Sequence, residues 1–153
     1  MTIYEELLEE ANNSGLIVRE KTLSGSDGLI YKNRIAISNR LKTSAEKACV
    51  LAEEIGHHHT AVGDIFNTQN IENMKQEQKG RLHGYNRMIG LRGIISAFNA
   101  GCQNRYEVAE HLHVTEEYLQ EAIDCYTGKY GKCTTVENYV IYFIPNLAVM
   151  EMI

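Results

Sequence analysis

Residues 51–60 read LAEEIGHHHT and bring two carboxylates and a run of imidazoles onto one short segment. Residues four positions apart share one face of an α-helix, so Glu53 and His57 can point toward the same ion. Zinc accepts both carboxylate oxygen and imidazole nitrogen, and a catalytic zinc site combines three protein ligands with one open position. The segment therefore predicts two metal ligands, although Glu–His pairs at this spacing also occur on helices that bind no metal.

Glu54 follows the first of these residues directly. In the H-E-x-x-H pattern of zinc peptidases, two histidines bind the metal and the glutamate takes a proton from water. The same frame here is Glu53-Glu54-Ile55-Gly56-His57, so a glutamate stands at the position of the first histidine. We expect Glu54 to be the general base. The exchange replaces a neutral nitrogen ligand by a harder, charged oxygen, which changes the affinity for metal.

A third ligand is predicted on the next helical segment, EQKGRLHG, where Glu77 follows His57 by twenty residues. A glutamate on a second helix can supply the third oxygen or nitrogen donor that a catalytic zinc site needs. Taken alone, Glu77 is equally typical of an exposed helix charge. Zinc is the expected ion, although an oxygen-rich site would also accept manganese or iron.

Further polar residues surround these candidates. In a shifted frame, Glu54 and His58 are four residues apart and could bind the metal, but Glu54 would then no longer serve as the base. We expect His58 and His59 to occupy supporting or exposed positions instead. His83 is expected to pack in the core or line the site. Asp64 is expected to cap a turn or to orient a ligand histidine.

The N-terminal third predicts one helix and a small sheet. Apolar residues recur at helical spacing over residues 3–12, and NNSG then ends the helix. Residues 16–23 and 28–38 are rich in β-branched and aromatic residues, with a turn expected at KNR. We expect a small antiparallel hairpin or a three-stranded meander.

The helix that carries the candidate ligands should begin at a capping box, because Glu46 follows Thr43 by three residues. Residues 61–73 are expected to form a loop, and helical character resumes over residues 75–91. In the last third, a helix, a break at HV and a second helix opened by Thr115 follow the pattern of a helix-turn-helix. NYVIYFIPNLAVM should close the chain as a strand or an apolar tail. The expected class is α+β.

Composition restricts the class of protein. The chain has 153 residues and a net charge of −5, which suits one well-packed domain and opposes binding to nucleic-acid phosphates. The segment TEEYLQEAIDCY has no lysine or arginine, so we expect no direct contact with DNA. No secretory signal is visible, and the run YVIYFI is far too short to span a bilayer. We therefore expect a cytoplasmic protein without membrane contact.

The chain resembles the ImmA/IrrE-family metallopeptidases, in particular small members from phages and mobile elements of Gram-positive bacteria. The resemblance runs from about residue 25 to residue 145. It rests on GLIYKNRIAIS, KACVLAEEIGHHHTAVGDI, KQEQKGRLHGYNRMIG and VAEHLHVTEEYLQEAIDCY, and LAEEIGH…VGDI is its most specific part.

The resemblance implies a single domain over residues 1–153, with a zincin-like core at about 15–90 and a helical portion with a helix-turn-helix-like region at about 91–153. It implies that Glu53, His57 and Glu77 bind zinc and that Glu54 acts as the base. The implied function is a zinc-dependent endopeptidase-like anti-repressor that acts on a helix-turn-helix transcriptional repressor. The alternative is a degraded protein of the same fold that binds a repressor or serves in a toxin–antitoxin pair without catalysis.

Overall fold

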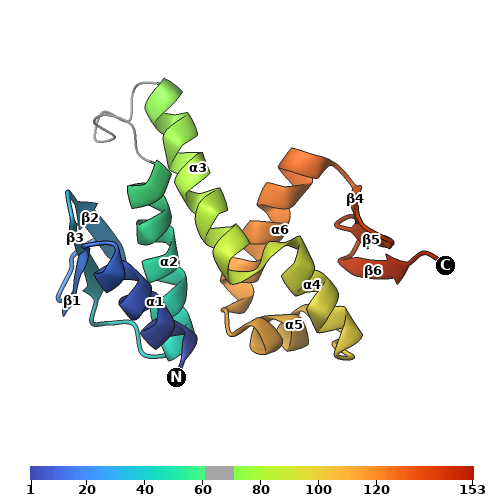
Figure 1. The fold of residues 1–153 in the computed structure, drawn as a ribbon, viewed down its shortest axis with the longest axis horizontal. Helices are drawn as coiled ribbons and strands as arrows, with labels where there is room; N and C mark the ends of the chain where they lie inside the picture. The colour runs from blue at the N-terminus through green and yellow to red at the C-terminus, as the bar shows by residue number, and fades with distance from the viewer. Residues whose placement is uncertain (61–70) are drawn as a thin grey trace. The chain divides into compact units, whose positions relative to one another are not determined.

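The computed structural model describes residues 1–60 and 71–153. The fold combines helices with two small β-sheets, which confirms the predicted α+β class. The chain forms two compact units, Met1–Arg87 and Met88–Ile153, and each unit has helices and one sheet of its own (Figure 1). That the two units form one domain stays a prediction.

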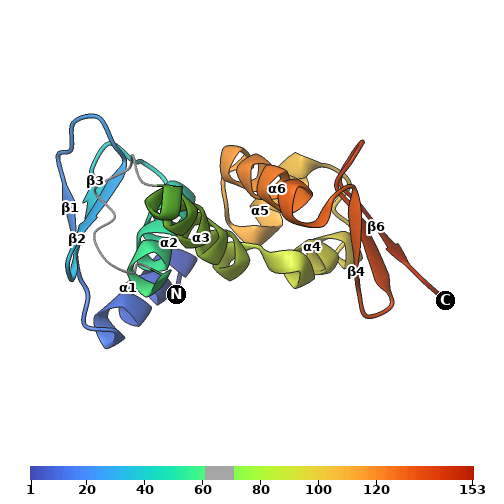
Figure 2. The same cartoon turned by 90° about the horizontal axis from the view of Figure 1, so that it is seen from above.

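Among its described residues, the first unit contains three helices and a three-stranded sheet, and α1 and α2 lie beside the sheet (Figure 2). The expected helix at residues 3–12 and the helix after residue 75 are both present. The elements are α1 (Ile3–Asn13), β1 (Ile17–Lys21), β2 (Gly28–Tyr31), β3 (Arg34–Ser38), α2 (Ser44–Thr60) and α3 (Ile71–Met88), whose last residue belongs to the second unit.

The sheet of the first unit has the strand order β1-β3-β2. Strands β2 and β3 form the expected antiparallel hairpin, and its turn includes Lys32 with a positive φ of 54°. However, β1 pairs with β3 in parallel, so the prediction of an antiparallel sheet or meander is wrong for this strand. The chain crosses from one edge of the sheet to the other between β1 and β2, which leaves β3 in the centre. Ile35 and Ile37 alternate along β3 and are both buried.

Helix α2 begins at the predicted capping box. The backbone nitrogen of Glu46 donates to Oγ1 of Thr43 at 3.1 Å, and the backbone nitrogen of Thr43 donates to Oε1 of Glu46 at 3.3 Å. These two bonds satisfy amide groups that have no partner within the helix. One face of α2 is then buried against α1 and the sheet. The buried apolar side chains on α2 are Ala48, Cys49, Leu51, Ala52 and Ile55.

The second unit places three helices with an antiparallel sheet of order β4-β5-β6. The predicted break between two helices is confirmed, because His113 takes a left-handed conformation and Oγ1 of Thr115 accepts from the backbone nitrogen of Tyr118. The segment expected to close the chain as a strand or an apolar tail forms two strands that pair with each other, and the first of them also pairs with β4. The elements are α4 (Gly90–Asn99), α5 (Arg105–Leu112), α6 (Glu116–Tyr130), β4 (Cys133–Val136), β5 (Tyr139–Tyr142) and β6 (Ala148–Glu151).

Apolar residues fill the interior of the second unit, where Tyr126 is the largest fully buried side chain and its ring lies near the rings of Tyr130 and Phe143. Residues of α4, α5, α6 and β5 contribute the remainder of this core. Over the residues that the structure describes, no helix is both long enough and apolar enough to cross a membrane.

Candidate metal centre

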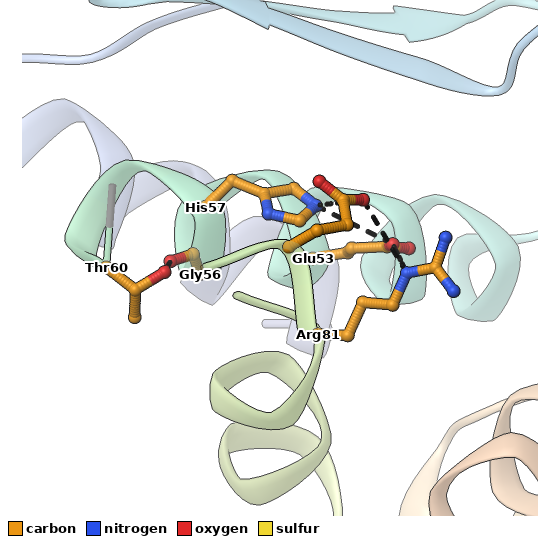
Figure 3. Close-up of polar contacts among 6 residues, drawn as sticks. Glu53, Gly56, His57, Thr60 and Arg81 are labelled. Carbon is orange, nitrogen blue, oxygen red and sulfur yellow. Dashed lines mark hydrogen bonds and ion pairs between the residues drawn. The ribbon is translucent and has the colours of Figure 1, made fainter. Parts of the chain in front are cut away.

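Glu53, His57 and Glu77 converge on one point of the first unit, with one ligand atom from each lying within 4.8 Å of the others. Nε2 of His57 is 3.7 Å from Oε1 of Glu53 and 3.3 Å from Oε1 of Glu77 (Figure 3). Ligand atoms that share a tetrahedral ion at about 2.1 Å lie about 3.4 Å apart. The three residues, with one nitrogen and two oxygen donors, could therefore hold a metal ion.

A close crossing of two helices positions these side chains. Glu53 and His57 lie one turn apart on α2, and Glu77 comes from α3. A Cβ atom at Gly56 would overlap the carbonyl oxygen of Gly80, and a Cβ atom at Gly80 would overlap Nδ1 of His57. Because both side chains are absent, the backbones of α2 and α3 approach each other, and the ring of His57 fits against Gly80 with Nε2 toward the carboxylates.

The electrostatic environment favours a charged pair when no metal is bound. His57 is buried, with 6% of its surface exposed. Burial by itself would lower the pKa of His57, but the hydrogen bond with Glu53 and the negative charges of Glu77, Glu54 and Glu53 raise it above its usual value. Burial by itself would raise the pKa of Glu53, but the hydrogen bond with His57 and the charge of Arg81 lower it. A metal ion that binds here therefore competes with a proton for His57 more strongly than it would at an ordinary histidine.

Glu54 lies next to the three convergent residues and is itself buried, with 9% of its surface exposed. Its side chain faces β2, because a Cβ atom at Gly28 would lie 3.2 Å from Oε1 of Glu54. Burial raises the pKa of Glu54 to about 7; the charges of Glu53 and Glu77 add to this effect, and His57 opposes it. A carboxyl group with this pKa can accept and return a proton near neutral pH.

Arg81 of α3 also belongs to the site, and sequence reasoning missed it. Its Nε atom lies 3.2 Å from Oε1 of Glu53 and 3.7 Å from Oε1 of Glu77 (Figure 3). The signal that could have found Arg81 is its spacing, because it follows Glu77 by four residues and shares that face of the helix. Gly80 was missed as well, and an isolated glycine within a helical segment is a known sign of close packing.

The remaining predicted residues lie around this centre. His58 is half-buried and His59 is exposed, and their ring centroids are 5.5 Å apart. The ring of His83 on α3 is half-buried and lies 5.4 Å from that of His59; burial and the charge of His59 lower the pKa of His83. Among the described residues, only Glu53, His57 and Glu77 form a metal-ligating group of three or more, so the shifted frame with His58 gains no support.

Asp64, for which a capping or orienting role is expected, lies outside the described residues. The same holds for residues 61–70 of the expected loop at 61–73, whereas residues 71–73 begin α3, so the loop prediction is wrong there. Comparisons with protein-family models, with curated proteins and with solved structures found no match to this chain. The resemblance to the ImmA/IrrE family therefore stays a prediction.

Proposed function

We propose that this protein is a zinc-dependent endopeptidase-like anti-repressor that acts on a helix-turn-helix transcriptional repressor. The observation that supports the proposal most is the convergence of Glu53, His57 and Glu77 beside a buried Glu54. This arrangement supplies three ligands and a carboxyl group of suitable pKa, which are the protein groups that metal-assisted peptide hydrolysis requires. Other divalent ions suit the same donors, because two of the three are carboxylate oxygens.

Each residue has a separate role in this proposal. Zinc held by these residues would supply Lewis acidity toward a peptide carbonyl group and toward water. His57 and the two ligand carboxylates hold the ion. Glu54 accepts the proton of the attacking water on its carboxylate and returns that proton to the departing amine.

The fold fits the same proposal. We infer that the first unit is a zincin-like core, because the helix with two candidate ligands lies against a sheet and a second helix brings the third ligand. We infer that α5 and α6 form the helix-turn-helix-like region of the sequence resemblance. Residues 115–126, which open α6, carry acidic and amide side chains and no lysine or arginine, which favours a protein partner over DNA.

The test co-expresses the protein with a candidate helix-turn-helix repressor, which is sought among the genes adjacent to its own. We expect repressor fragments with the wild type, and at least about 10²-fold less cleavage with Glu54→Gln, which keeps the size of the side chain but removes the basic carboxylate. Metal content should persist in this variant. Glu9→Gln, a change at an exposed carboxylate of α1, is the matched control and should cleave like the wild type. Intact repressor with the wild type would contradict the proposal.

A second candidate function is repressor binding without catalysis, alone or within a toxin–antitoxin pair. Arg81 favours this candidate, because its guanidinium already compensates the charge of Glu53 and Glu77 in the absence of an ion. Under this alternative, the wild type and Glu54→Gln should relieve repression equally, while the repressor stays intact and in complex with the protein. The same co-expression experiment distinguishes the two candidates.

A further inference from the structure

Arg81 contacts the same two oxygen atoms that face Nε2 of His57. Oε1 of Glu53 and Oε1 of Glu77 lie 3.7 and 3.3 Å from Nε2 of His57, and Nε of Arg81 lies 3.2 and 3.7 Å from the same two oxygens. The guanidinium therefore lies at the centre itself and not on a distant part of the helix surface. Arginine stays charged at every relevant pH, so this position carries a fixed positive charge.

The charge of the ligand set explains why a cation is useful here. Two histidines and one glutamate bring one negative charge to a metal, whereas His57 with two glutamates brings two. A second carboxylate donates more negative charge to the ion and weakens it as a Lewis acid. The positive charge of Arg81 offsets one of these two negative charges. The net charge around the ion then equals that of a site with two histidines and one glutamate.

We propose that Glu53 and Arg81 act together as one neutral ligand unit in place of a histidine, with Arg81 as the charge-compensating residue. The inference rests on the proposed metal site. Its geometric basis is that Arg81 follows Glu77 by four residues on α3 and reaches across to Glu53 on α2. The guanidinium therefore lies within reach of the carboxylates of two helices and offsets one of their charges.

This role predicts a direction for metal affinity that a purely structural role does not. Removal of Arg81 takes a positive charge away from the ion, so a divalent cation should bind more tightly. Because Arg81 and both carboxylates are partly exposed, water screens the effect, and we expect the dissociation constant to fall about three- to tenfold. A residue that only orients a ligand behaves in the opposite way, since its removal weakens metal binding by about 10–100-fold.

The experiment measures Zn²⁺ affinity by competition with a chromophoric chelator, at one fixed pH and salt concentration. The proteins compared are the wild type, Arg81→Gln and Arg81→Lys. Arg81→Lys keeps the positive charge and should remain close to the wild type. Lys79→Gln is the matched control, because it removes the same charge from an exposed position of the same helix. Its affinity should equal that of the wild type. Circular dichroism confirms that each variant is folded.

The outcomes separate this inference from the proposed function. Tighter binding by Arg81→Gln, with Arg81→Lys and Lys79→Gln near the wild type, supports the role of Arg81. Unchanged or weaker binding by Arg81→Gln overturns that role and leaves the metal site intact. If Arg81→Gln bound zinc and the wild type bound none, the role of Arg81 would be upheld. A zinc-dependent function of the wild type would be contradicted. Absence of binding by every protein would overturn both.

Discussion

The imidazole ring of His57 lies against the backbone of Gly80, at the point where α3 crosses α2. A side chain on Gly80 would overlap Nδ1 of His57, so the ring occupies space that only a glycine at this position leaves open. The packing of two helix backbones thus sets the direction of Nε2, the atom that faces both carboxylates. Gly80 thus contributes to the position of His57 through packing, although it supplies no donor atom to the metal centre.

Gly80→Ala should displace His57 and weaken the centre. The added methyl group overlaps the ring and must push the ring or the helix away, which we expect to cost about 1–3 kcal/mol of unfolding free energy. Zinc affinity should fall together with stability, because Nε2 of His57 leaves the carboxylates. Chemical denaturation and chelator competition measure the two effects.

Gly128→Ala is the matched control for this change. Gly128 lies in α6, and a Cβ atom there would meet no heavy atom within 4 Å. Alanine is the better helix former, so this variant should gain about 0.5–1 kcal/mol of unfolding free energy. If both glycine variants were equally stable, the close crossing at Gly80 would be contradicted.

Metal removal should lower the thermal stability of the wild type, because an ion that binds only the folded state stabilises that state. His57→Ala and the milder Glu77→Gln should abolish the response of the melting temperature to chelator. His59→Ala, a change at an exposed histidine two residues further along α2, should keep it. An equal chelator response in all four proteins would mean that metal binds elsewhere.

The metal-free protein should lose stability as pH rises, because of Glu54. The pKa of Glu54 rises from 4.5 in the unfolded chain to about 7 in the folded protein, so the folded state binds more protons between these values. Unfolding free energy should therefore fall as pH increases through this window. The ionised carboxylate costs about 3 kcal/mol once pH exceeds both pKa values.

Glu54→Gln isolates this effect, since a neutral amide does not titrate. In the presence of chelator, the variant should be more stable than the wild type at about pH 8, and its advantage should nearly vanish at about pH 5. His57, whose pKa is also raised, causes a further loss on the alkaline side in both proteins. Urea titrations at the two pH values measure the difference. A constant difference would contradict a raised pKa of Glu54.

Thr43→Ala should destabilise the helix that carries the candidate ligands. It removes the side-chain oxygen that accepts from the backbone nitrogen of Glu46, a loss that costs about 1 kcal/mol at a helix N-terminus. Thr43→Ser keeps this oxygen and should remain within a few tenths of a kcal/mol of the wild type. Denaturation midpoints of the two variants provide the comparison.

Local sequence signals determined much of the first unit. The spacing of apolar residues predicts helix α1. Thr43 and Glu46 predict the capping box of α2, and the turn at Lys32 predicts the hairpin of β2 and β3. The approach of Glu53 to His57 follows as well, because residues four apart on a helix are neighbours in any tertiary context. These features depend on contacts between residues that are close in the chain. The spacing of residue types along the sequence therefore predicts them.

Only the tertiary structure decided which distant surfaces meet. The parallel pairing of β1 with β3 depends on where α1 and α2 lie, and strand patterns in the sequence do not encode that choice. The position of Glu77 beside His57 depends on a helix crossing that Gly56 and Gly80 permit. The pKa of Glu54 depends on burial beneath β2, and the role of Arg81 depends on two helices that bring their charges together. In each case the cause is packing between segments that are far apart in sequence. The burial of a side chain and the charges around it depend on the whole fold and not on one segment.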